Sequence, residues 1–128
     1  MKIEHIALWT NNLELMREFY QKFFSMKCGE KYKNLDNDFS SYFLSFDSGA
    51  RIEIMNRTDI SGEIGIKGIS NGLTHFAISV GTKGKVDVLT EMIRTNGHKV
   101  IGEPRTTGDG YYESVVLDPE GNHVEITE

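Results

Sequence analysis

The sequence has little of several features that mark common classes of protein. Of 128 residues, one is cysteine, two are proline and one is tryptophan. The single cysteine, Cys28, cannot form an intramolecular disulfide, which favours a reducing compartment such as the cytoplasm. No apolar run is long enough to cross a membrane, and Met1-Lys2 leads directly into a predicted strand without the apolar segment of a signal peptide. The sequence therefore predicts a cytoplasmic protein with no membrane partner.

Clustered positive charge is also missing. The chain has 14 Lys and Arg against 19 Asp and Glu, a formal net charge of −5. Proteins that bind nucleic acids need a basic patch to contact phosphates, so we expect no nucleic-acid partner. A chain of 128 residues is large enough for one domain with a real core and too small for two full ones.

What the sequence does contain is an internal repeat. The segment His5-Ile6-Ala7-Leu8 returns 70 positions later as His75-Phe76-Ala77-Ile78. Residues 42–55 correspond to residues 114–127 at an offset of 72, which aligns Glu53 with Glu125. Each half of the chain therefore begins with a histidine on a strand and ends with a glutamate on a strand, which indicates a duplication.

The hydrophobic pattern predicts the same order of elements in both halves: strand, helix and three strands. Asn11 or Asn12 is expected to cap the first helix, and Gly97 to end the second. The apolar face of the first helix comprises Leu13, Met16, Phe19, Tyr20, Phe23 and Phe24, and that of the second Val86, Leu89, Met92 and Ile93. The predicted strands are 2–9, one near 31, 40–46, 51–55, 73–80, one at 100, 111–117 and 123–127, and the second helix is 84–96.

This pattern predicts the α+β class, with two repeated βαβββ modules and helices on one face of a mixed sheet. We place module one at about 1–57, a glycine-rich connector at about 58–71 and module two at about 72–128, within one domain of residues 1–128.

The repeat brings four chemically useful side chains to one face. Because strand residues alternate, the apolar positions around each glutamate must face the helices, and these are Ile52, Ile54, Val124 and Ile126. The four residues that face the other way are His5, Glu53, His75 and Glu125. Two imidazoles and two carboxylates form a nitrogen and oxygen site for a divalent first-row metal, with coordination positions left open for a substrate.

The motifs resemble those of the vicinal oxygen chelate superfamily, which includes glyoxalase I, epimerases, thiol transferases and extradiol dioxygenases. The resemblance covers nearly the whole chain and is carried by Glu4-His5-Ile6-Ala7-Leu8, Glu18-Phe19-Tyr20, Leu73-Thr74-His75-Phe76-Ala77, and Asp118-Pro119-Glu120-Gly121-Asn122 followed by Glu125. The order His, Glu, His, Glu is most similar to bacterial glyoxalase I, and Glu53 is the residue that distinguishes it from the other members.

The resemblance implies a cupped sheet with helices outside and one divalent ion (Ni, Zn, Co, Mn or Fe) on His5, Glu53, His75 and Glu125. It implies a homodimer and a lactoylglutathione lyase-like reaction, in which Glu53 or Glu125 transfers a proton through a metal-bound enediolate of a small hydroxy-carbonyl or thiohemiacetal. The sequence leaves open which glutamate is the base, and whether the ligands come from one chain or two.

Residues around this set are candidates for contact with the substrate: Trp9, Arg51, Arg105, Tyr111 and His123. Trp9 stands where glyoxalase I commonly has an arginine that contacts glutathione, so a glutathione adduct is not assumed. Residues Gly102 to Gly110 are expected to form a covering loop. The alternatives are an epimerase or thiol transferase of the same superfamily, and a non-enzymatic protein that sequesters a ligand or drug in a cup lined by Trp9, Tyr42 and Tyr111.

Overall fold

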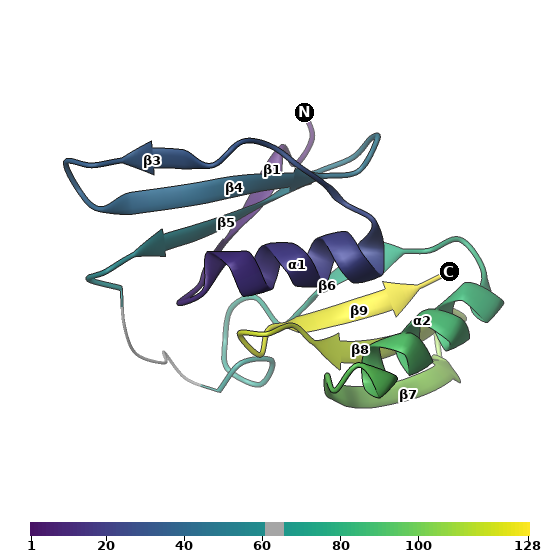
Figure 1. Ribbon diagram of the computed structural model, residues 1–128. Coiled ribbons are helices and arrows are strands. Elements are labelled where there is room, and N and C mark those ends of the chain that lie inside the picture. Colours follow the sequence, from purple (N-terminus) through teal and green to yellow (C-terminus); the bar gives the residue numbers. More distant parts are fainter. Residues whose placement is uncertain (61–65) are drawn as a thin grey trace. The chain divides into compact units, whose positions relative to one another are not determined.

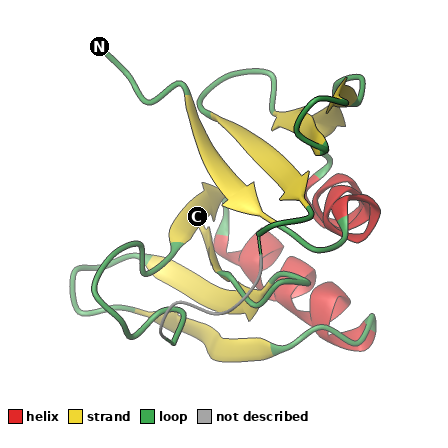
Figure 2. Cartoon of the chain, turned by 90° about the vertical axis from the view of Figure 1, so that its left-hand side faces the viewer, coloured by secondary structure: helices red, strands yellow, loops and turns green. Residues whose placement is uncertain are grey.

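The computed structural model describes residues 1–60 and 66–128, so residues 61–65 of the predicted connector lie outside the described residues. The chain divides into two compact units, Met1–Gly62 and Glu63–Glu128, and we describe each by itself. Figure 1 labels the elements along the chain, and Figure 2 distinguishes helices from strands. None of the helices in the described part of the chain is long and apolar enough to cross a membrane.

The first unit is a mixed sheet with one helix. Its elements are β1 (His5–Trp9), α1 (Leu13–Phe24), β2 (Lys27–Cys28), β3 (Tyr32–Asn34), β4 (Phe39–Ser45) and β5 (Arg51–Arg57). The strand order is β1-β5-β4-β2, and β3 pairs with β4. β1 runs parallel to β5, and the other pairs are antiparallel.

The second unit repeats this arrangement. Its elements are β6 (Phe76–Ser79), α2 (Lys83–Thr95), β7 (Val100–Thr106), β8 (Tyr112–Leu117) and β9 (His123–Thr127). The order β6-β9-β8-β7 matches β1-β5-β4-β2 strand for strand. The register matches as well, because Ala7 pairs with Glu53 and Ala77 pairs with Glu125. The predicted α+β class with two repeated modules is confirmed, and each module has a sheet of its own.

Each helix begins at a capping residue and buries an apolar face. The side chain of Asn12 accepts a hydrogen bond from the Leu15 amide, and Thr82 does the same for Lys85. The six apolar residues predicted for α1 are all buried, and α1 packs against β4 and β5. In α2 the prediction for Met92 is wrong, since this residue is 39% exposed and Thr90 is buried instead.

Burial in the sheets follows the predicted alternation. Ile52, Ile54, Val124 and Ile126 are at most 5% exposed and form part of the core. The glutamates between them, Glu53 and Glu125, therefore lie on the opposite face of their sheets. Within each unit this places the predicted ligands on the face away from the buried core residues.

Two local predictions are wrong. Most of the expected covering loop is strand, because β7 continues to Thr106 and pairs with β8 through a bulge. A Cβ atom on Gly102 would lie 3.2 Å from the Val115 side chain, so this glycine allows the two strands to pack closely. Tyr42 pairs with Ile54 and hydrogen-bonds Glu14 of α1, so it lies on the helix side of the sheet instead of beside Trp9.

Candidate metal and substrate site

Each unit holds one of the two predicted histidine–glutamate pairs. In the first, Nε2 of His5 at the start of β1 lies 3.8 Å from Oε2 of Glu53 on β5. In the second, Nε2 of His75, just before β6, lies 3.3 Å from Oε2 of Glu125 on β9. The parallel pairing of first and last strand in each module brings these residues together. The structure therefore brings together, within each unit, the histidine and the glutamate that the sequence repeat places in that unit.

The donor atoms of each pair suit a divalent ion. Bonds of about 2.0–2.2 Å from one ion to an imidazole nitrogen and a carboxylate oxygen let these atoms lie up to about 4 Å apart. Separations of 3.8 Å and 3.3 Å are within that reach. Both glutamate side chains are only 15% exposed, while the imidazoles reach solvent. A partly covered carboxylate beside an accessible imidazole is an arrangement that could bind a metal and keep coordination positions open.

Each pair supplies two donors, and the described parts of the chain contain no group of three or more His, Cys, Asp or Glu side chains arranged to hold a metal. The union of the two pairs into one four-ligand site stays a prediction that follows from the repeat.

In the first unit, three other side chains surround His5. Glu4 accepts a hydrogen bond from His5 Nδ1 at 2.5 Å and another from Nε of Arg51 at 2.8 Å. The guanidinium of Arg51 lies 4.0 Å from the centre of the Phe43 ring. The hydrogen bond from His5, together with Arg51, lowers the pKa of Glu4, so Glu4 is a carboxylate at neutral pH. Arg51, predicted to contact substrate, thus has partners within the protein.

In the second unit, a glutamate that the sequence analysis missed lies beside the pair. Glu113 on β8 is 14% exposed, and Nη2 of Arg105 lies 3.9 Å from its carboxylate. Burial raises the pKa of the Glu125 carboxyl, and the charge and hydrogen bond of Glu113 raise it further, while His75 opposes the rise. Alternation could have indicated Glu113, because it lies two residues before Val115, the partner of Glu125 across β8 and β9.

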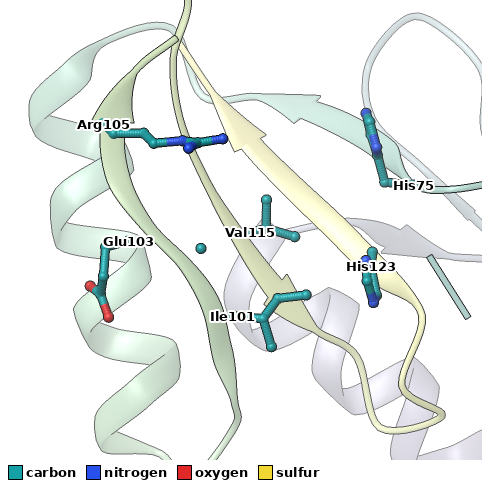
Figure 3. A pocket seen from close by; sticks show the side chains of 7 residues that line it. His75, Ile101, Glu103, Arg105, Val115 and His123 are labelled. Carbon is teal, nitrogen blue, oxygen red and sulfur yellow. The ribbon is translucent and has the colours of Figure 1, made fainter. Parts of the chain in front are cut away.

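A pocket of about 440 Å³ opens in the second unit (Figure 3), lined by His75, Ile101, Gly102, Glu103, Arg105, Val115 and His123. Two of the predicted substrate residues, Arg105 and His123, line it from β7 and β9. The Glu103 carboxylate is held by Arg94 of α2 at 2.6 Å. Tyr111 is exposed and does not line this pocket. The pocket therefore combines an apolar wall with a guanidinium and two imidazoles, one of which belongs to a predicted ligand pair.

Trp9, the remaining predicted substrate residue, lies in an exposed aromatic cluster of the first unit. Its ring meets Phe39 edge to face at 6.2 Å, and Phe39 in turn meets Tyr32 at 6.1 Å. The guanidinium of Arg57 lies 5.5 Å from the centre of the Trp9 ring. Trp9 shares a strand face with His5 and Ala7.

Comparison with known families gives the class of the protein. Residues 2–126 match the sequence profile of the Glyoxalase/Bleomycin resistance protein/Dioxygenase superfamily, and the chain belongs to that superfamily. Its members commonly bind a metal ion and act on small molecules. A search of curated proteins finds no match.

Solved structures with the same fold include several glyoxalases. Glyoxalase I from Zea mays aligns with a TM-score of 0.82 at 24% identity, over 98% of this chain and 44% of that chain. The trypanothione-dependent glyoxalase I of Leishmania major aligns with a TM-score of 0.80 at 19% identity, over 100% of this chain and 86% of that one. A superfamily domain from Frankia sp. aligns with a TM-score of 0.82 at 16% identity, over 99% and 96%. The chain thus spans less than half of the Zea mays protein, and these likenesses establish the fold.

Proposed function

We propose that the protein is a metal-dependent enzyme of the glyoxalase I type, a lyase or isomerase that transfers a proton next to a carbonyl group. Its substrate is a small hydroxy-carbonyl compound or a thiohemiacetal. The observation that carries this proposal is the pair of repeat-related histidine–glutamate contacts, with Nε2–Oε2 separations of 3.8 Å and 3.3 Å. A protein that only binds an apolar ligand would gain nothing from two carboxylates largely removed from solvent, because burial of a charge without a partner is costly.

The proposed ligands are His5, Glu53, His75 and Glu125, which together bind one divalent ion per chain from the group Ni, Zn, Co, Mn and Fe. Such an ion supplies Lewis acidity that polarises the substrate carbonyl and stabilises negative charge on its oxygen. Metal content after incubation with each salt, measured by elemental analysis, tests this part. A protein that takes up no divalent ion would contradict it.

The chain's own residues move the proton. Glu53 or Glu125 removes it from the carbon beside the carbonyl and returns it to the neighbouring carbon. His75 contacts the Glu125 carboxylate and also lines the pocket, so a substrate in the pocket would lie beside the imidazole that contacts one of the two candidate bases. Arg105 and His123 are proposed to bind polar groups of the substrate there. Trp9, Arg51 and Tyr111, which do not line this pocket, stay proposed substrate contacts on the sequence argument alone.

Deuterium exchange tests the reaction directly. Metal-loaded protein is incubated in deuterated water with methylglyoxal plus several thiols, and separately with a panel of 2-oxo and 2-hydroxy carbonyl compounds. We expect exchange beside the carbonyl that Glu53→Gln or Glu125→Gln lowers by about 10²–10⁴-fold, the usual contribution of a general base. Glu18→Gln, which changes an exposed glutamate of α1, is the matched control and should leave the rate unchanged. No exchange with any compound contradicts the proposal.

The aromatic cluster of the first unit favours a second candidate, a protein that sequesters an aromatic ligand without chemistry. Trp9 is the one tryptophan of the sequence, so fluorescence excited at a wavelength that tyrosine does not absorb reports on this cluster. Quenching of that fluorescence by an aromatic compound in metal-free protein, together with no exchange activity, would favour the binder.

The assembly state is part of the same proposal. Proteins of this fold often form dimers, and we expect a homodimer, with the ligand pairs supplied by one chain or by two. Light scattering at micromolar concentration measures it, and a monomer would contradict it.

A further inference from the structure

Both ring nitrogens of His5 face a glutamate carboxylate, but only one of them is within hydrogen-bonding distance. Nδ1 lies 2.5 Å from Oε2 of Glu4, while Nε2 lies 3.8 Å from Oε2 of Glu53. The Glu4 carboxylate can only accept, so Nδ1 of His5 is the donor and carries the hydrogen. In the neutral ring the lone pair is then on Nε2, the atom that faces Glu53. This is the tautomer that a metal ligand at Nε2 requires.

Glu4 is itself fixed in place, although its side chain is partly exposed. Its Oε1 accepts from Nε of Arg51 at 2.8 Å, and Nη2 of the same guanidinium is also in contact. The backbone carbonyl of Glu4 accepts from the Arg51 amide at 2.9 Å. Glu4 and Arg51 are therefore joined through both backbone and side chains. Two guanidinium nitrogens on one carboxylate give a defined geometry, unlike a single exposed ion pair.

A fourth residue closes the group. The ring of Phe43 on β4 lies under the Arg51 guanidinium at 4.0 Å, and its edge meets the His5 ring with centres 5.5 Å apart at 85°. Glu4, His5, Arg51 and Phe43 thus form a closed circuit of contacts, which we call the His5 brace. It spans β1, β5 and β4, all of which belong to the first unit.

The second unit shows that the brace is not a necessary product of the fold. The repeat places Thr74 where Glu4 stands, His123 where Arg51 stands and Val115 where Phe43 stands. None of these three side chains is a carboxylate that could accept a hydrogen bond from the His75 ring. Val115 and His123 line the pocket instead.

We propose that Glu4, supported by Arg51 and Phe43, is a positioning residue that holds His5 in the Nδ1–H tautomer and so presents Nε2 to the metal. The metal role of His5 rests on the proposed function, whereas its tautomer does not. An outer carboxylate on a metal-binding histidine fixes the ring and raises its basicity, and its loss typically lowers metal affinity about 10–100-fold.

The first test is nuclear magnetic resonance of the metal-free, full-length protein with ¹⁵N-labelled histidine, at a pH where the imidazoles are neutral. The sequence has four histidines, so the His5 signals are assigned by their loss in His5→Asn. We expect the Nδ1–H form at His5, and a shift toward the Nε2–H form in Glu4→Ala. Thr74→Ala is the matched control at the corresponding position and should change neither His5 nor His75. An Nε2–H form in the unmodified protein, or no change in Glu4→Ala, would overturn the proposal.

The second test measures Zn²⁺ affinity by competition with a chromophoric chelator. Glu4→Ala should bind Zn²⁺ about 10–100-fold more weakly, and Arg51→Ala should show a smaller loss, because Glu4 then keeps its hydrogen bond without support. Equal affinity in Glu4→Ala and the unmodified protein would count against the brace. If the protein binds no metal at all, the proposed function fails, while the tautomer measurement still decides the role of Glu4. Circular dichroism checks that each variant is folded, and Glu4→Leu, which has a similar size but cannot accept a hydrogen bond from Nδ1, replaces Glu4→Ala if that variant is not.

Discussion

The two units place different side chains at corresponding positions around the same histidine–glutamate pair. In the first, the Arg51 guanidinium lies over the Phe43 ring and donates a hydrogen bond to Glu4. In the second, Val115 and His123 stand at those positions and line a pocket of about 440 Å³. Both copies of the repeated module have the histidine–glutamate pair, and the residues around the pair differ. The His5 ring contacts Glu4 and Phe43 in the first copy, whereas a pocket opens beside His75 in the second.

The edge strands contribute to this difference. β7 is seven residues long and supplies Ile101, Gly102, Glu103 and Arg105 to the pocket wall, whereas the corresponding β2 has only two residues. The three-residue β3 pairs with the same edge of β4, so the first unit has two short strands where the second has the continuous β7.

The largest expected effects come from removing the histidine of the histidine–glutamate pair that both units contain. His5→Ala and His75→Ala should each lower metal affinity by more than about 100-fold, since even the loss of an outer partner costs about 10–100-fold. Isothermal titration with Zn²⁺ measures this, with His98→Ala as the control. If one variant loses the metal and the other binds normally, the pairs are not equal parts of one site.

A second prediction tests whether the residue at position 115 affects substrate binding without affecting metal binding. Val115→Phe places in the second unit the residue that the first unit has, and should fill the pocket. We expect KM for the compound with the fastest exchange to rise about tenfold or more, as one or two kcal/mol of contact is lost, with Zn²⁺ affinity unchanged.

The reciprocal variant, Phe43→Val, removes the support of the Arg51 guanidinium and the His5 ring. It should weaken Zn²⁺ binding while KM changes little. Identical effects of the two variants on KM and on metal affinity would contradict this difference between the units.

Much of the fold and of the candidate site could be predicted from the sequence, because the sequence patterns that indicate them are local. The alternation around Glu53 and Glu125 fixes which face each strand buries, and the observed burial of Ile52, Ile54, Val124 and Ile126 follows it. The order of the elements followed from the repeat. These patterns need no knowledge of which strands pair.

The parts that were missed depend on partners far apart in the sequence. β7 contains Gly102 and Pro104 and so has the composition of a loop, yet it lies at the edge of its sheet, where a proline need not donate a ladder hydrogen bond. The role of Glu4 depends on Arg51, which is brought to it by the pairing of β1 with β5. Thr90 is polar on an otherwise apolar face, and only contact with β8 explains its burial.

The contact between Thr90 and Ser114 gives a third prediction. It compares the polar contacts that join α2 and α1 to their sheets. Thr90 donates to the Val86 carbonyl at 2.6 Å, so its oxygen accepts from Ser114 of β8, also at 2.6 Å. Thr90→Val leaves the buried Ser114 hydroxyl without its acceptor, which should lower the free energy of unfolding by about 1–3 kcal/mol. Urea denaturation measures the loss. Adding Ser114→Ala should restore part of it, because both polar groups are then gone, and a double variant that is less stable than Thr90→Val would contradict this account.

The smallest expected effect concerns α1. Its polar contact with the sheet is made by the charged Glu14 and not by a buried pair of hydroxyl groups. Glu14 accepts hydrogen bonds from Lys31 at 3.1 Å, Tyr42 at 3.0 Å and Arg17 at 2.9 Å. The hydrogen bond from Lys31, with those from Tyr42 and Arg17, lowers the pKa of Glu14 below its ordinary value of 4.5. The side chain is 47% exposed, so solvent screens these contacts and Glu14→Gln should cost only about 0.5–1 kcal/mol near neutral pH.

The pH dependence of this effect follows from the direction of the shift. A carboxyl whose pKa is lowered on folding stabilises the protein above its unfolded pKa, and that stabilisation is lost as the pH falls through the folded value. The difference between the unmodified protein and Glu14→Gln should therefore be constant from about pH 6 to 8 and decline below about pH 4.5. Glutamine keeps the acceptor oxygen for Tyr42 and Lys31, so urea denaturation across this range isolates the charge. A difference that persists unchanged at pH 3 would mean that packing, and not charge, holds Glu14 in place.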